Sequence, residues 1–230
     1  MDEIFPARTV SCQALTRTDV VSLAAVRAPS HLLDCELDDA DLSGLDLMGW
    51  RFERCNARHT NFAGARLEGA RLQSCRGAFA SFVGTDLTDA ALASCDFNNS
   101  AFRTARLTGA TFTGCKLTGA DLSDAKAMDV RFEETLLISA KLPAHSFRKQ
   151  TLRRVDFGHA DLRKCDFRET VFEGCSLRDA NLAGARFDMA DLRGADLGGL
   201  RLIEASLFRG ATISREQAGQ LLAELGLRLG

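Results

Sequence analysis

The residues of this 230-residue chain that could most readily take part in catalysis or bind a metal are its eight cysteines and four histidines. Six of the cysteines share one spacing of twenty residues, with Thr135 and Val155 at the two places between the fifth and the sixth: Cys35, Cys55, Cys75, Cys95, Cys115 and Cys175. No C-x-x-C pair occurs, and an interval of twenty is not that of a zinc-binding module. We therefore expect these thiols to be buried as small apolar side chains, with no metal and no cofactor.

Other catalytic arrangements are also missing from the sequence. The histidines (His31, His59, His145 and His159) form no ligand motif, and there is no nucleophile elbow, zinc-protease helix, phosphate-binding loop or dinucleotide-binding glycine motif. Thiols stacked about 5 Å apart would meet the Cα separation of a disulfide, but parallel side chains and a reducing compartment argue against one. The sequence predicts a protein that is not an enzyme.

A column of Leu and Phe at every fifth position must determine where these side chains lie. It runs from Leu32 to Leu207 without a change of phase, and 33 of its 36 positions are Leu or Phe; the exceptions are Ala57, Gly77 and Ala127. A period of five fits neither the 3.6 residues of a helix nor the alternation of a strand. A repeat this long predicts a solenoid.

Small residues two places before each Leu or Phe complete the repeat. The resulting pentapeptide reads A-[D/N/R]-[L/F]-x-x, as in residues 120–124, and Gly recurs at its fifth place, where a tight corner can use a positive φ. Because twenty residues are four pentapeptides, the cysteine spacing predicts a four-sided coil with the thiols in one interior column. His145 and Gln150 are too large for the small position, which predicts a local bulge between Pro143 and Lys149, with a binding role as the alternative.

The two ends of the chain differ from the repeat. Residues 1–31 lack the period and are expected to form an irregular N-terminal cap, in which Val20 to Val26 make a short strand or helix over the first coil. Residues 32–210 would form about nine coils. In residues 211–230, Ser214 and Gln217 make a capping box that predicts a short α-helix, and Gly226 suits its end.

This pattern of pentapeptides closely resembles the pentapeptide-repeat proteins, and the resemblance extends from Leu32 to Leu207. It implies an all-β solenoid, the right-handed quadrilateral β-helix of that family, with four pentapeptides in each coil. It also implies that the Leu or Phe and the small residue two places before it face inward. The short α-helix predicted in residues 211–230 would follow the β-helix at its C-terminal end.

Within the family, the chain is similar to the Qnr-type quinolone-resistance proteins, including the mycobacterial type without large loops. The similarity rests on the uninterrupted repeat and on the C-terminal helix with its Leu-Gly-Leu-Arg-Leu tail. It implies binding to DNA gyrase and topoisomerase IV as a mimic of duplex DNA, resistance to topoisomerase poisons, and a homodimer formed through the C-terminus. Apolar residues near that end are the expected dimer contacts: Ile203, Phe208, Leu221, Leu222, Leu225, Leu227 and Leu229. The alternative is that this stretch forms a lid over the last coil of its own chain.

Charge gives this reading only partial support. The net charge is −2, which indicates no general preference for nucleic acid or for an anionic membrane. One of the four predicted sides has a surplus of acids, seven against four bases, and its candidate partner-facing residues are Glu36, Asp38, Asp39, Asp156, Asp179 and Asp196. The alternative is a scaffold that binds a different protein. With no basic and apolar leader and no run of eighteen apolar residues, we expect a cytoplasmic protein without a membrane segment.

Overall fold

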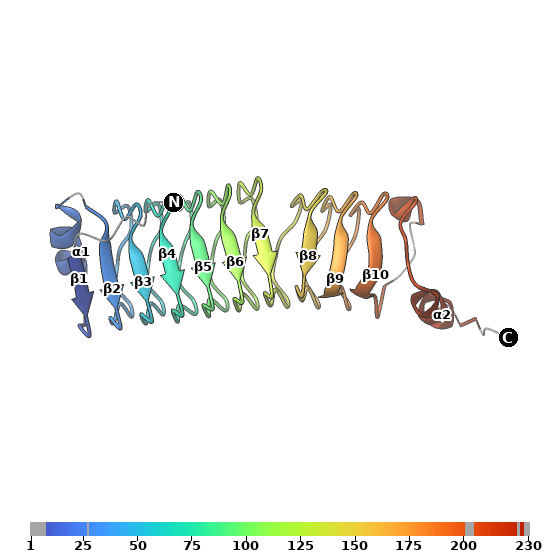
Figure 1. Ribbon diagram of the computed structural model, residues 1–230, viewed down its shortest axis with the longest axis horizontal. Helices are drawn as coiled ribbons and strands as arrows, with labels where there is room; N and C mark the ends of the chain where they lie inside the picture. Colours follow the sequence, from blue (N-terminus) through green and yellow to red (C-terminus); the bar gives the residue numbers. More distant parts are fainter. Residues whose placement is uncertain (1–7, 27, 201–204, 225, 228–230) are drawn as a thin grey trace. The chain divides into compact units, whose positions relative to one another are not determined.

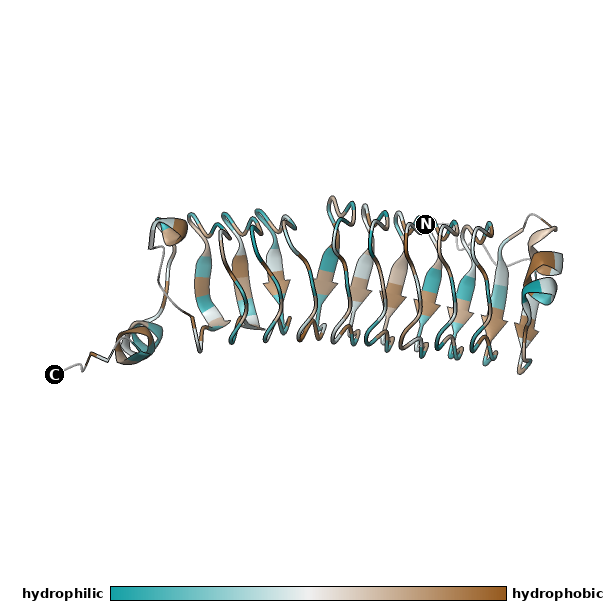
Figure 2. Ribbon diagram, turned by 180° about the vertical axis from the view of Figure 1, so that it is seen from behind, coloured by the Kyte–Doolittle hydropathy of each residue, from teal (hydrophilic) through white to brown (hydrophobic). Residues whose placement is uncertain are grey.

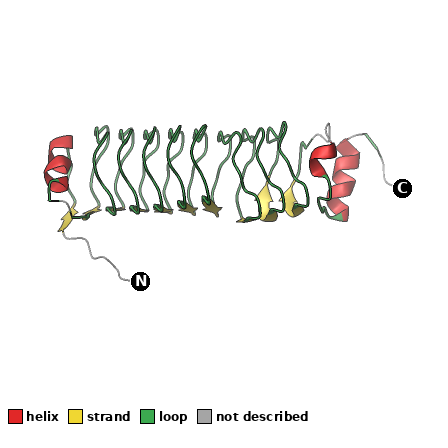
Figure 3. Ribbon diagram, turned by 90° about the horizontal axis from the view of Figure 1, so that it is seen from above, coloured by secondary structure: helices red, strands yellow, loops and turns green. Residues whose placement is uncertain are grey.

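The computed structural model describes residues 8–26, 28–200, 205–224 and 226–227, and it divides into two compact units, 1–131 and 132–230 (Figure 1). In each unit the chain winds into right-handed, four-sided coils of twenty residues, with one short parallel strand per coil. Strands lie along one side of the coils, and most of the other sides are turns (Figure 3). The fold class expected from the pentapeptides is confirmed.

In the first unit, six strands pair in parallel in the order of the sequence. Each strand has its counterpart about twenty residues later, so that Phe52 lies opposite Leu32 on one side and Leu72 on the other. The strands are β1 (Arg8–Ser11), β2 (Ser30–Leu33), β3 (Arg51–Glu53), β4 (Arg71–Gln73), β5 (Ala91–Ala93) and β6 (Thr111–Thr113).

Three of the four sides of a coil end in a hydrogen-bonded turn and the strand side ends in a bend, which explains the period of five. The N–H of Ala40 donates to the carbonyl of Leu37 at 2.9 Å, while the N–H of Leu37 donates to Asn56 in the next coil at 2.7 Å. The residue before each small position, such as Asp39 or Gly44, often has a positive φ. Gly, Asn and Asp tolerate this conformation best, which accounts for the glycines at the fifth place.

Leu and Phe side chains fill the interior of the coils and leave polar residues outside, as the alternation of colours along the strands shows (Figure 2). Aromatic rings of successive coils stack nearly parallel, with centroids 5.0 Å apart for Phe62 and Phe82 and 4.7 Å apart for Phe82 and Phe102. Gly77 breaks the column for a steric reason. A Cβ at this position would lie 2.2 Å from Cε1 of Phe97, whose ring already occupies the space.

The N-terminal stretch is more regular than expected. Strand β1 pairs with β2, and helix α1 (Arg17–Ala24) follows a capping box between Thr16 and Asp19. The helix buries Val20 and Leu23, which are 0% and 6% exposed. Strand pairing and apolar cover thus both meet the first coil, as a solenoid end requires.

The second unit is wound in the same way and contains strands β8 (Thr151–Arg153), β9 (Val171–Ser176) and β10 (Asp191–Asp196), while β7 (Arg131–Glu133) spans the division between residues 131 and 132. The bulge expected between Pro143 and Lys149 is absent on the side of the following coil, where the backbone bonds from Ala144 to Arg163 and from Lys149 to Arg168 keep the regular spacing. No bulge is needed on this side because His145 fits inside: its side chain is 5% exposed.

The register changes near the end of this unit. The N–H of Phe187 donates to the carbonyl of Leu207, whereas in a regular coil the acceptor lies nineteen residues later. The ring of Phe187 stacks on that of Phe208, with centroids 4.8 Å apart. The sequence placed Leu207 in the core column and Phe208 on the outside, which is wrong because the chain here is one residue longer than a regular coil. Phe208 lies in a short 3₁₀ helix, η1 (Ala205–Phe208), and continues the stack of Phe147, Phe167 and Phe187.

Helix α2 (Arg215–Glu224) ends the second unit and has the predicted caps. Ser214 and Gln217 bond reciprocally, at 2.6 Å from the Ser214 N–H to Oε1 and at 3.1 Å from the Gln217 N–H to Oγ. Gly226 has φ +79°, and the N–H of Leu227 reaches back to Leu222. The Gln217 amide also donates to the carbonyls of Leu192 and Ala195, both at 2.7 Å, so that it occupies backbone acceptors that a further coil would otherwise use.

Candidate protein-binding surface

The outward side chains of the coils are the surface on which this protein can act. Three of every five residues point outward, and positions twenty apart lie next to one another because their backbones form bridges, as Glu36 does with Asn56. We use the name "36–39 side" for the side that begins at residues 36, 38 and 39 and recurs every twenty residues. It contains all six acids predicted to face a partner.

In the first unit, the 36–39 side is acidic only at its start. Glu36, Asp38 and Asp39 are exposed together in the coil that follows β2. Glu36 accepts a hydrogen bond from the Asn56 amide at 2.7 Å. The next coils add Asp96 but also three bases, which leaves four acids against three bases on this side of the unit: Arg58, Arg76 and Lys116.

In the second unit, two of the three predicted acids are engaged by their own chain. Asp156 accepts the N–H of Gly158 at 2.8 Å, and Asp196 forms a two-point ion pair with Arg178 at 2.9 and 3.2 Å. Asp179 is exposed. A line of free negative charge comparable to the phosphates of a duplex therefore does not form on this side of the unit.

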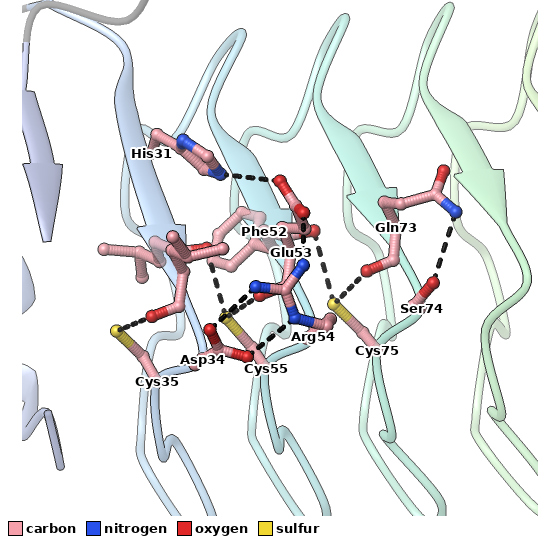
Figure 4. Close-up of polar contacts among 12 residues, drawn as sticks. His31, Asp34, Cys35, Phe52, Glu53, Arg54, Cys55, Gln73, Ser74 and Cys75 are labelled. Atoms are coloured by element: carbon pink, nitrogen blue, oxygen red, sulfur yellow. Dashed lines mark hydrogen bonds and ion pairs between the residues drawn. The ribbon is translucent and has the colours of Figure 1, made fainter. Parts of the chain in front are cut away.

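Elsewhere the charges are paired between neighbouring coils (Figure 4). Arg54 donates to both oxygens of Asp34 at 2.8 Å and also pairs with Glu53, which in turn lies 3.1 Å from His31. The Arg54 hydrogen bonds hold the pKa of the Asp34 carboxyl below its usual range. Similar pairs join Arg66 to Asp46 and Arg106 to Asp86 in the first unit and Arg153 to Glu173 and Arg154 to Glu134 in the second.

The cysteine column is interior, as predicted, but its thiols are not merely apolar filling. The Cys55 thiol donates to the carbonyl of Leu32 at 3.3 Å, and Cys75 does the same to Phe52 (Figure 4). Thr60 and Thr85 occupy the same kind of position and bond to the carbonyl 23 residues earlier at 2.7 Å. The small position therefore accepts alanine, and it also accepts a short side chain, such as Cys or Thr, that donates a hydrogen bond.

Sequence reasoning overlooked this role because it followed the spacing of cysteine alone. Cys165 lies outside the twenty-residue series, yet it is buried and donates to Leu142 at 3.1 Å. Burial raises the pKa of its thiol to about 12, so that it stays protonated and unreactive. The signal that could have found this set is the presence of Ser, Thr and Cys together at the small position.

His145 is the one buried side chain in the described part of the chain with a polar atom that has no hydrogen-bond partner, its Nε2. Burial lowers the pKa of its imidazole to about 4, so the ring is neutral at physiological pH. Among the described residues, no group of three or more metal-binding side chains comes together. The interior is thus suited to packing rather than to chemistry.

The predicted dimer contacts fall into three groups. Leu221 is buried in its own chain, and Phe208 is stacked on Phe187. Leu222 is half-buried, and Leu227 is 56% exposed. The other three lie outside the residues whose side chains the structure describes: Ile203, Leu225 and Leu229.

Comparisons with known proteins agree with this geometry. The family model described as pentapeptide repeats matches residues 32–76 and 160–199, and the model described as a pentapeptide repeat region matches residues 85–162. The chain belongs to the pentapeptide-repeat proteins. No curated protein matches it by sequence.

One similar solved structure of the family is a trypsin-treated variant of QnrB1, a plasmid-mediated fluoroquinolone resistance protein. It superposes with a TM-score of 0.75 at 21% identity, and the match covers 97% of this chain and 100% of that one. Full-length QnrB1 gives 0.72 at 20% identity over 95% and 100%. HetL, from the cyanobacterium Nostoc and involved in the regulation of heterocyst differentiation, gives 0.45 at 21% identity over 86% and 94%. At these identities the likeness shows the fold.

Within the described residues, no helix is long and apolar enough to cross a bilayer.

Proposed function

We propose that this pentapeptide-repeat protein is a non-enzymatic binding protein whose partner is a type II topoisomerase such as DNA gyrase, and that it counters topoisomerase poisons such as quinolones. The observation that supports this most is the match to QnrB1, a fluoroquinolone resistance protein, along the whole length of both chains. In this proposal the outward sides of the coils are the surfaces with which the protein acts. Such a role is carried out in the cytoplasm.

Imitation of DNA by this chain would depend on shape more than on charge. Many of the described acids lie beside a base of the neighbouring coil or of their own turn, as Asp34 does beside Arg54 and Asp196 beside Arg178. The free carboxylates of Asp38, Asp39 and Asp179 are the part of the 36–39 side that is left to meet a basic surface of the topoisomerase. The predicted role of the side is thereby concentrated in fewer residues.

Supercoiling by purified gyrase, measured with and without a fluoroquinolone while the protein is added, tests the proposal. We expect inhibition of supercoiling at micromolar protein and less cleaved DNA in the presence of the drug. The double variant Asp38→Asn with Asp39→Asn should weaken both effects about tenfold, which corresponds to roughly 1.4 kcal/mol of binding. The matched control is Asp124→Asn with Asp129→Asn, which changes two exposed acids on other sides of the same unit.

The second candidate is a scaffold that binds a different protein, and the extensive pairing of surface charges favours it. A paired surface has a weak field and recognises by shape and local contacts rather than by long-range attraction. Absence of both inhibition and protection at micromolar protein would contradict the topoisomerase proposal and leave this one.

We also propose that the chain forms a homodimer through its C-terminal region. Leu227 and Ile213 are 56% and 37% exposed at the end of the second unit, where apolar side chains favour an isologous contact. Sedimentation velocity should show a dimer, and Leu222→Asp with Leu227→Asp should yield monomers. Gln220→Asp, on the exposed face of the same helix, is the control; an unchanged sedimentation coefficient in the double variant would contradict the proposal.

A further inference from the structure

Two successive coils of the first unit bring four exposed side chains together on the 36–39 side: Arg58, His59, Arg76 and Phe79. The imidazole of His59 and the ring of Phe79 are parallel, with an interplanar angle of 2° and centroids 5.3 Å apart. The backbones beneath them are joined, since His59 donates to Ala78 at 3.1 Å and Ala57 donates to Arg76 at 2.6 Å. We call these four side chains the 58–79 patch.

Phe79 is an unusual residue for its place in the repeat. It has φ +63° and its side chain is 53% exposed. The equivalent positions in the coils on either side are His59 and Asn99, and those one coil further away are Asp39 and Gly119. All four are residue types that adopt a left-handed conformation more readily than phenylalanine. A phenylalanine here is strained, contributes nothing to the core and exposes an apolar ring, so the fold does not account for it.

The charges of the patch also differ from those around it. Among the described residues, neither Arg58 nor Arg76 has an ion-pair partner, whereas Arg54 and Arg66 on other sides each pair with an acid of the preceding coil. The coil before the patch exposes Glu36, Asp38 and Asp39. Along the axis of this unit, an acidic cluster is therefore followed by an aromatic and basic one.

These features describe the chemistry of an occupant. Because the rings cover one another's faces, they present their edges outward, and ring edges have a partial positive charge that attracts the face of another aromatic ring. A guanidinium beside such a ring adds a cation–π contact, and two unpaired guanidiniums attract carboxylates. The preceding carboxylates attract a basic side chain, at a distance of one to two coils, about 5 to 10 Å.

We propose that the 58–79 patch binds a protein segment in which an aromatic residue lies next to carboxylates at one end and to a basic residue at the other. The proposal holds whichever protein the chain recognises, so it goes beyond the topoisomerase assignment. Single-stranded nucleic acid fits less well, because each ring covers one face of the other and leaves less ring surface for a base to stack on, and because three carboxylates lie beside the patch.

Fluorescence anisotropy with a labelled peptide of sequence KKSWEE tests this directly, because its basic end and its tryptophan are separated by the required distance. We expect saturable binding to the full chain. Phe79→Asn should weaken it about tenfold, and this variant should fold normally because Asn99 adopts the same conformation at φ +57° in the next coil. Arg58→Gln with Arg76→Gln should weaken it to a similar extent.

The matched control is Met189→Asn, which replaces the other large apolar residue that is exposed, at 68%, in the left-handed conformation, at φ +60°. It should leave the affinity unchanged, and the peptide KKSAEE should bind poorly to every variant. Equal affinity of the wild-type chain and Phe79→Asn would overturn the proposal. So would the absence of binding at millimolar peptide, or tighter binding of a thymidine oligonucleotide than of KKSWEE.

Discussion

Gln217 allows the sharpest test of how the second unit is closed. Its side chain is 6% exposed and makes three hydrogen bonds: Oε1 accepts from Ser214, and the amide nitrogen donates to Leu192 and Ala195. In Gln217→Leu the side chain keeps a similar volume but leaves one donor and two acceptors without a partner. At about 1 kcal/mol for each net hydrogen bond, the terminal coil should lose roughly 3 kcal/mol.

Hydrogen exchange measured residue by residue is the appropriate assay, because a solenoid frays from its end and only the local opening free energy is expected to change. The amide of Leu192, which donates to Thr212 at 2.8 Å, reports on the terminal coil. A loss of 3 kcal/mol predicts exchange that is on the order of 100-fold faster. The amide of Leu162, which donates to Asn181 deeper in the unit, should change little.

The control is Gln220→Leu, which changes an exposed residue of the same helix. Gln217→Glu should destabilise more than Gln217→Leu at neutral pH, because a carboxylate would face two carbonyl oxygens. The carboxyl group introduced at position 217 would have a raised pKa in the folded state. Part of the free energy of unfolding should therefore be recovered at a pH below the pKa of this group in the unfolded chain, and it should be lost again as the pH rises. Exchange at Leu192 in Gln217→Leu within threefold of the wild type would refute the reasoning.

Three further predictions concern packing and titration. Gly77→Ala should lower the free energy of unfolding by about 1–3 kcal/mol, measured by urea denaturation, because the new Cβ meets the Phe97 ring at 2.2 Å; an unchanged midpoint would show that the ring moves freely. His145 has a pKa near 4, so the free energy of unfolding of the second unit should fall by up to about 3 kcal/mol as the pH falls from 6.5 to 4. The variant His145→Ala should lack this dependence on pH. An identical dependence in the variant would exclude this imidazole as its cause. Asp161, Asp166 and Asp191 have pKa values lowered by hydrogen bonds from Arg163, Arg168 and Arg193, so their contribution should be complete above about pH 4 and disappear as the pH falls further; a pH-independent urea midpoint below pH 4 would contradict it.

Much of the fold could be predicted because the pentapeptide repeats one local solution. A turn on three of the four sides requires only that the small residue after each Leu or Phe donate back to it, as Ala40 does to Leu37. The capping box at Ser214 was equally local. The register change before Phe208 was not predictable, because a Leu still occupied position 207 and nothing in the spacing distinguished the two residues.

The surface was harder to predict because pairing depends on neighbours in space. A count of acids and bases could not show that Arg178 pairs with Asp196 while Arg58 and Arg76 pair with no acid among the described residues. Nor could it show that His59 and Phe79 stack, because a count of charges ignores aromatic rings, although the twenty-residue period places the two residues next to each other. The count of acids and bases overestimated the free negative charge of the 36–39 side.

The backbone bonds of the first unit have a consequence for how such a gene can change. Nearly all of them join residues nineteen to twenty-one places apart or close a turn between one pentapeptide and the next, as in the bonds from Leu67 to Asp86 and from Ala70 to Leu67. Duplication or loss of a twenty-residue block therefore leaves every remaining donor with an acceptor of the same kind. Lengthening by whole blocks is a nearly neutral step for folding, and it shifts any surface cluster relative to the ends without altering the cluster itself.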